Sequence, residues 1–115
     1  MRTKTALFLG AFNVALLTGC ASDVQQQRHS STAVERIKEQ RGACYADTAL
    51  SIDDGVSDAE IVGKAVSAHC RKYTEELIRL ASSDGPQAVR SIQQQAEDVA
   101  TTYVIEFRRL KKLPG

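Results

Sequence analysis

Apolar residues recur every three or four positions along the C-terminal part of the chain, and this spacing constrains the fold more than any other feature. The series covers residues 89–110, and such a period marks one face of an amphipathic α-helix. Asp84, Gly85 and Pro86 precede it, and proline is tolerated in a first helical turn. The face must be covered by other helices or by a second copy of the chain, so a homodimer stays open. Its members are Val89, Ile92, Ala96, Val99, Tyr103, Phe107 and Leu110.

A second helix is predicted to begin at Ser57 and to run to about Ser82. Ser57 and Glu60 have the spacing of a capping box, and Val56 can pack against Ile61 as a hydrophobic staple. The residues that follow have the same helical period as the first pattern. The apolar side of this helix is predicted to comprise Val62, Val66, His69, Tyr73, Leu77 and Leu80.

The first helix is expected to begin at a capping box formed by Thr32 and Glu35 and to end before the turn at Asp53-Asp54-Gly55. Its apolar stripe is thin, and Arg41 lies in the middle of it. Residues 32–115 are therefore predicted to form one small all-α domain, either a three-helix bundle or a helical hairpin with a third helix. The stripe of the first helix consists of Val34, Ile37, Cys44, Thr48 and Ile52.

Two segments of different composition precede this domain. Residues 20–31 have no apolar period and include three consecutive glutamines, so they are expected to form a flexible polar linker. Residues 1–19 begin with the basic residues Arg2 and Lys4 and continue as an apolar run. This run is interrupted by Asn13 and is shorter than the roughly 20 apolar residues of a membrane-spanning helix, which favours a cleaved signal peptide.

The sequence Leu17-Thr18-Gly19-Cys20 resembles the lipobox of bacterial lipoproteins. The resemblance covers only the first twenty or so residues, and it implies cleavage before Cys20, a diacylglycerol on its thiol and acylation of the new amino terminus. Several acyl chains hold a protein durably on a membrane. The resemblance also implies an outer-membrane location facing the periplasm in an organism with two membranes, because Ala21 stands where an aspartate would mark inner-membrane retention. The alternative is ordinary secretion with cleavage after Ala21.

Lipidation of Cys20 would leave Cys44 and Cys70 from the three cysteines of the chain. An oxidising compartment outside the cytoplasmic membrane favours a disulfide between them. The alternative is a pair of buried thiols that behave as small apolar side chains. The predicted helices place the two cysteines about 10 and 18 Å from the connecting turn, so pairing requires staggered helices or an early end of the first helix.

Other reactive residues do not form a recognisable catalytic or metal-binding pattern. Cys44, Cys70 and His69 are suitable metal ligands by type, but no close-spaced ligand pair supports a metal site. His69 and Cys70 are neighbours on a helix and would point about 100° apart, which disfavours a catalytic pair. The acidic pairs Glu75-Glu76 and Glu97-Asp98 are typical of solvated helix faces. We therefore expect no enzyme activity, no metal and no cofactor.

Charge restricts the candidate partners. Loss of Arg2 and Lys4 with the signal peptide leaves thirteen basic and fourteen acidic residues, which argues against nucleic-acid binding. Basic residues do gather at the end of the last helix, where they either oppose the helix dipole or contact anionic lipid or polymer. These candidate contact residues are Arg108, Arg109, Lys111 and Lys112.

The sequence therefore predicts a non-catalytic envelope lipoprotein that is tethered through Cys20 and acts by contacting a protein or the cell wall. The alternative is a membrane-active or lysis-type small lipoprotein whose last helix lies on lipid, with its basic end at the headgroups. A third interpretation is a carrier that holds a small ligand between its helices.

Overall fold

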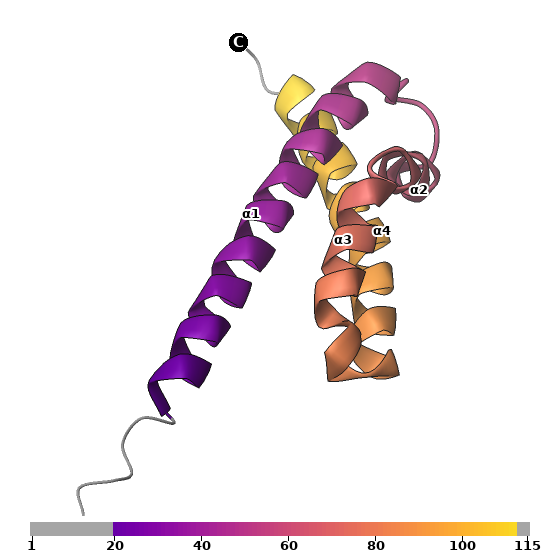
Figure 1. Cartoon of the computed structure of the whole chain (residues 1–115). Coiled ribbons are helices and arrows are strands. Elements are labelled where there is room, and N and C mark those ends of the chain that lie inside the picture. The colour runs from indigo at the N-terminus through magenta and orange to yellow at the C-terminus, as the bar shows by residue number, and fades with distance from the viewer. Residues whose placement is uncertain (1–19, 113–115) are drawn as a thin grey trace, which may run out of the picture.

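The computed structural model describes residues 20–112, with the backbone alone described for residues 20–27 and 29. Every regular element in this part of the chain is helical, which confirms the predicted all-α class. Figure 1 shows a long first helix that diverges from a hairpin of two later helices. In chain order the elements are α1 (Cys20–Ile52), α2 (Ala59–His69), α3 (Arg71–Ala81), the short 3-10 helix η1 (Ser82–Asp84) and α4 (Pro86–Lys111).

Helix α1 is one continuous helix of 33 residues. The structure therefore differs from the expected linker, because residues 20–31 are helical and α1 has no start at Thr32. The Thr32 hydroxyl donates a hydrogen bond to the Arg28 carbonyl at 3.0 Å, so it lies inside the helix instead of capping it. No glycine or proline interrupts the chain between Cys20 and Gly42, which explains why the helix can begin so early.

The predicted second helix is divided at Cys70 into α2 and α3. Cys70 has φ −94° and ψ 16°, outside the usual α-helical range, and its carbonyl accepts a hydrogen bond from the Tyr73 amide at 3.2 Å. Figure 1 shows α2 nearly end-on, whereas α3 lies beside α4. The chain therefore changes direction at the residue that carries the second disulfide sulfur.

The start of α2 also differs from the predicted cap. Asp58 is the N-cap, and its carboxylate accepts a hydrogen bond from the Glu60 amide at 2.8 Å. Ser57 instead bonds to the Asp54 carboxylate. The predicted staple is wrong, because Val56 is 90% exposed and Ile61 is 66% exposed.

The core is built around the crossing of α2 and α4. A Cβ atom on Gly63 would lie 2.7 Å from the Thr101 Cα atom, so the two helix backbones are in direct contact there. Such a crossing requires small side chains on α4, and Ala96, Ala100 and Val104 are its buried residues. The buried face of α4 is therefore rotated from the predicted one, because Val99 and Leu110 of the predicted stripe are exposed.

Helix α1 contributes the largest fully buried side chain, Tyr45, which the predicted stripe did not include. Its ring meets the Tyr103 ring edge-on, with 6.0 Å between centroids, and Tyr103 lies 6.5 Å from the Phe107 ring. These aromatic contacts join α1 to α4. Of the predicted stripe, Ile37 and Thr48 are buried, and Ile52 is exposed.

Candidate functional site

The predicted lipid attachment site lies at the beginning of α1. Cys20 is the first residue of that helix, but its side chain and the predicted signal peptide (residues 1–19) lie outside what the structure describes. Across residues 20–112, none of the helices combines the length and the apolar character that a transmembrane span requires. Lipidation of Cys20 therefore stays a prediction.

The predicted disulfide joins Cys44 of α1 to Cys70, the residue between α2 and α3, with 6.0 Å between their Cα atoms. Cys44 lies eight residues before the end of α1, whereas Cys70 lies eleven residues after the start of α2. This difference amounts to about 4.5 Å of helix, and the connection at residues 53–58 absorbs it. The early end of the first helix that the sequence left open is therefore not needed.

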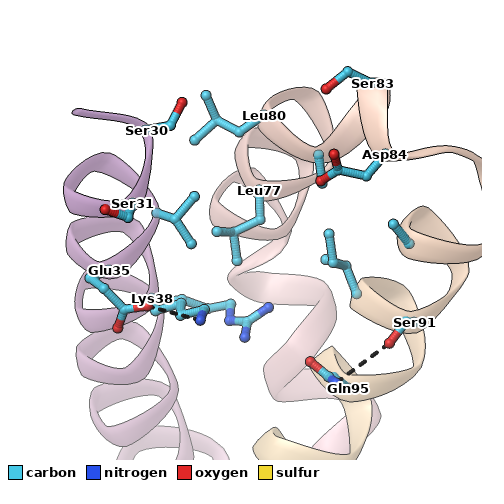
Figure 2. A pocket seen from close by; sticks show the side chains of 15 residues that line it. Ser30, Ser31, Glu35, Lys38, Leu77, Leu80, Ser83, Asp84, Ser91 and Gln95 are labelled. Carbon is cyan, nitrogen blue, oxygen red and sulfur yellow. Dashed lines mark hydrogen bonds and ion pairs between the residues drawn. The ribbon is translucent and has the colours of Figure 1, made fainter. Parts of the chain in front are cut away.

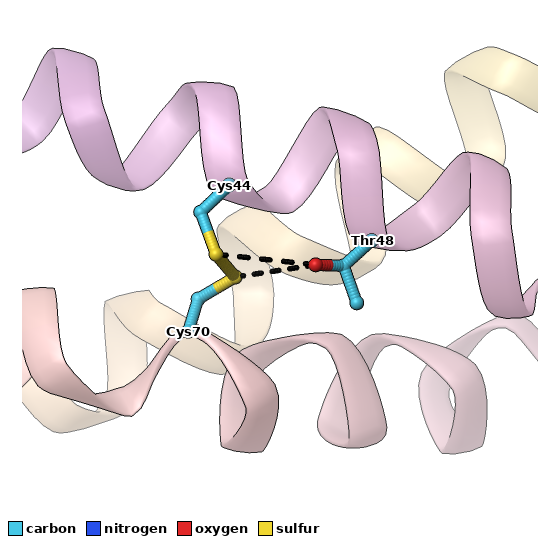
Figure 3. Close-up of a disulfide and its surroundings, with 3 residues drawn as sticks. All are labelled: Cys44, Thr48 and Cys70. Carbon is cyan, nitrogen blue, oxygen red and sulfur yellow. Dashed lines mark hydrogen bonds between the residues drawn. A yellow bond between two sulfur atoms is a disulfide. The ribbon is translucent and has the colours of Figure 1, made fainter.

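The disulfide is packed against the hydroxyl group of Thr48 (Figure 3). The Thr48 oxygen lies 3.5 Å from the Cys70 sulfur and 3.9 Å from the Cys44 sulfur. Because both sulfurs are bonded to each other, neither is a thiolate that could attack a substrate or bind a metal. Within residues 20–112, no group of three His, Cys, Asp or Glu side chains is arranged to hold a metal ion, and His69 is exposed.

Arg108, a predicted contact residue, is bound inside the domain. Its guanidinium donates to the Asp53 carboxylate, with the shortest distance 2.6 Å from Nη2 to Oδ1, and it donates to the Ser57 carbonyl at 2.7 Å. The hydrogen bonds from Arg108 to the carboxylate hold the pKa of Asp53 below its usual value. Arg108 therefore stabilises the connection between α1 and α2, a role that its position in a basic cluster did not reveal.

The other three basic candidates are exposed. Arg109 pairs with Glu106 on the same helix, with 2.8 Å between Nη2 and Oε2. Lys111 and Lys112 lie in the last turn and at the C-cap of α4, where positive charge opposes the helix dipole. The structure thus separates the basic cluster into one internal residue and three residues at the surface.

Exposed apolar side chains accompany these three basic residues at the end of the domain remote from Cys20. The ends of α1 and α4 meet there, as the contact between Asp53 and Arg108 shows. Val56 is the most exposed, at 90%. We call this region the distal end; its exposed apolar side chains lie on several helices and on different helix faces, and they are Leu50, Ile52, Val56, Ile61, Ile105 and Leu110.

The chain matches no protein-family model, no curated protein and no solved structure. Its function is therefore inferred from its own residues.

Proposed function

We propose that the protein is a non-catalytic lipoprotein of the bacterial cell envelope. Acyl chains on Cys20 tether it to a membrane, which is the outer membrane facing the periplasm in an organism with two membranes. The helical domain contacts a protein or cell-wall partner through its distal end. No metal and no cofactor take part in this function.

The observation that carries the proposal is the length of α1. Its 33 residues extend about 50 Å at 1.5 Å per residue. The first ten of these residues, about 15 Å of helix, precede Ser30, where α1 comes to lie opposite Leu80 and Asp84 of the hairpin. A helix with its first residue on the membrane surface would therefore act as a stalk that holds the domain away from the lipid.

The distal end supports the choice of partner surface. It combines exposed apolar side chains with the basic residues Arg109, Lys111 and Lys112. Apolar groups at the surface gain free energy when a partner covers them, and the lysines favour an anionic protein or polymer. The stalk would direct this surface away from the membrane.

The membrane-active alternative has less support. It requires the apolar side of α4 to lie on lipid, but Ala96, Ala100 and Val104 are buried in the domain core. Helix α4 would have to leave the bundle and expose Val62 and Val66 of α2. Leakage of anionic vesicles caused by the native protein would favour this alternative.

In-cell photo-crosslinking tests the proposal. A photoreactive residue in place of Leu110 should capture one defined partner, whereas the same residue in place of exposed Gln94 on α4 should capture none. Adding Cys20→Ser to the Leu110 variant should reduce the yield, because the protein would no longer be held near its partner. Equal yields from both positions would contradict a distal contact surface.

A further inference from the structure

A cavity of about 620 Å³ lies between α1 and the hairpin of α3, η1 and α4. Figure 2 shows Ser30 and Ser31 on the α1 side, Leu77 and Leu80 opposite, and Ser91 and Gln95 on the third wall. This volume falls within the range of roughly 300–1,000 Å³ that is typical of small-molecule sites. The apolar lining consists of Val34, Leu77, Leu80, Ala81, Ala88 and Ile92.

Arg41 also lines this cavity, and it is only 8% exposed. Its Nη1 atom is buried and has no hydrogen-bond partner within the described part of the chain. The guanidinium carbon lies 5.7 Å from the centroid of the Tyr45 ring, which is its cation–π contact. Glu35 also lines the cavity and is the acidic lining residue closest to Arg41 in the sequence. Its carboxylate pairs with Lys38 at 3.0 Å and not with Arg41.

A buried part of a positively charged group without a partner is costly, because the Nη1 group has lost water and gained no equivalent hydrogen bond. A carboxylate would restore what is missing, since its two oxygens match the planar guanidinium fork. The cavity thus combines one unmet anion-binding group with six apolar side chains. The other eight lining residues are polar or charged, and they include Lys38, Glu35 and Asp84. The preferred ligand is an anion with an apolar body.

The walls also indicate what this body is. Most of the lining residues lie inside helices, whose backbone amides and carbonyls are already paired, so an extended peptide would find few hydrogen-bond partners there; the exceptions are at the end of α3, in η1 and in the first turn of α4. An alkyl chain needs none. On α1 the lining extends from Ser30 to Arg41, about 16 Å of helix, which gives the cavity an elongated wall.

We propose that this cavity binds a long-chain aliphatic carboxylate, with its carboxylate on Arg41 and its alkyl chain between α1 and the hairpin of α3 and α4. The inference goes beyond the proposed envelope function and does not depend on it. A protein without lipidation or a distal partner would still have this site.

Calorimetric titration of the full-length protein tests the proposal, with dodecanoate kept below its micellar concentration. Dodecanol has the same chain without the charge, and butyrate has the charge with a short chain. The matched variants are Arg41→Met and Arg36→Met, because Arg36 is an exposed arginine of α1 that does not line the cavity. Binding elsewhere on the chain contributes equally to both variants.

Dodecanoate should bind the native protein and Arg36→Met equally, and Arg41→Met at least about tenfold more weakly, as expected for loss of a charged hydrogen bond. Dodecanol should bind the native protein and Arg41→Met alike. Equal dodecanoate affinity for the Arg41→Met and Arg36→Met variants would contradict the proposal, and so would equal affinity of the native protein for dodecanoate and dodecanol.

A second variant keeps the test valid if Arg41→Met lowers the helix content measured by circular dichroism. Leu80 is a half-buried wall residue, and Leu80→Glu places a negative charge in the path of the alkyl chain. This variant should also bind dodecanoate at least about tenfold more weakly than the native protein, because the new charge must lose water beside an apolar chain. Unchanged affinity would overturn the placement of the chain.

Discussion

Arg108 near the end of α4 holds Asp53, the first residue after α1, through three hydrogen bonds from its guanidinium. The two residues are 55 positions apart in the sequence, and the Asp53 side chain is only 1% exposed. The same guanidinium donates to the Ser57 carbonyl. This one side chain therefore joins the end of α1, the connection to α2 and the end of α4.

Replacement of Arg108 by alanine should lower the free energy of unfolding clearly more than a surface substitution does, because it leaves the Asp53 carboxylate without its partner. The matched control is Arg109→Ala, whose exposed pair with Glu106 should contribute less than about 0.5 kcal/mol. Urea denaturation of both variants measures the difference. Equal effects would show that the contact between Arg108 and Asp53 has no special role.

The carboxyl group of Asp54 should titrate at an unusually low pH. The Ser57 hydroxyl, the Ser57 amide and the Val56 amide donate to its charged form and lower its pKa from 3.8 to about 2. A lowered folded-state pKa stabilises the protein above the unfolded value, and the stabilisation is lost as the pH falls from 3.8 towards about 2.

Ser57→Ala should move the NMR midpoint of Asp54 upward, because it removes the largest of these contributions. Ser67→Ala is the control, since Ser67 lies on α2 away from Asp54. An Asp54 midpoint that is the same in all three proteins would contradict the assigned cause.

Removal of the disulfide should destabilise the domain through the entropy of the unfolded chain. The bond spans 26 residues, for which the chain-entropy relation gives about 3.5 kcal/mol. Cys44→Ser combined with Cys70→Ser should lower the unfolding free energy by about that amount in urea. Reductant should lower the stability of the native protein and leave the stability of the double variant unchanged. An equal effect on both proteins would mean that the reductant does not act through this disulfide.

Substitutions of Tyr45 can separate the contribution of packing to stability from that of hydrogen bonding. Its ring is fully buried, but its hydroxyl has no hydrogen-bond partner within the described residues. Tyr45→Ala should cost about 3–5 kcal/mol through loss of the ring. Tyr45→Phe should leave the stability unchanged or raise it by up to about 1 kcal/mol, because it removes a buried polar group that gains nothing. Thermal denaturation of both variants measures these effects. A clear loss of stability in Tyr45→Phe would show that the Tyr45 hydroxyl does make a hydrogen bond.

Local sequence rules predicted features that depend on a few adjacent residues. Gly85 has φ 96°, and Pro86 begins α4 as its position in the sequence indicated. The cysteine pairing was predicted because the expected lipidation of Cys20 leaves two of the three cysteines, and the bond between Cys44 and Cys70 confirms the pairing. Each of these inferences depends on one residue type with a strong and specific preference.

Features that depend on contacts between helices could not be predicted in this way. The close approach of Gly63 to Thr101 selects small residues on α4, whereas hydrophobic periodicity gives most weight to large ones. The break between α2 and α3 at Cys70 contains no glycine or proline from which it could be predicted. The burial of Arg41 was likewise hidden, because an arginine in an apolar stripe is read as an interruption and not as part of a cavity.

The lipid anchor on Cys20 is tested most directly by the intact mass of the mature protein extracted from bacterial membranes. The chain should begin at Cys20 and carry the added mass of a diacylglycerol and an amino-terminal acyl chain. The Cys20→Ser variant should accumulate as an uncleaved precursor without any lipid label. A native chain that begins at Ser22 without added mass, or a Cys20→Ser variant that is cleaved and stays on the membrane, would contradict the lipid anchor.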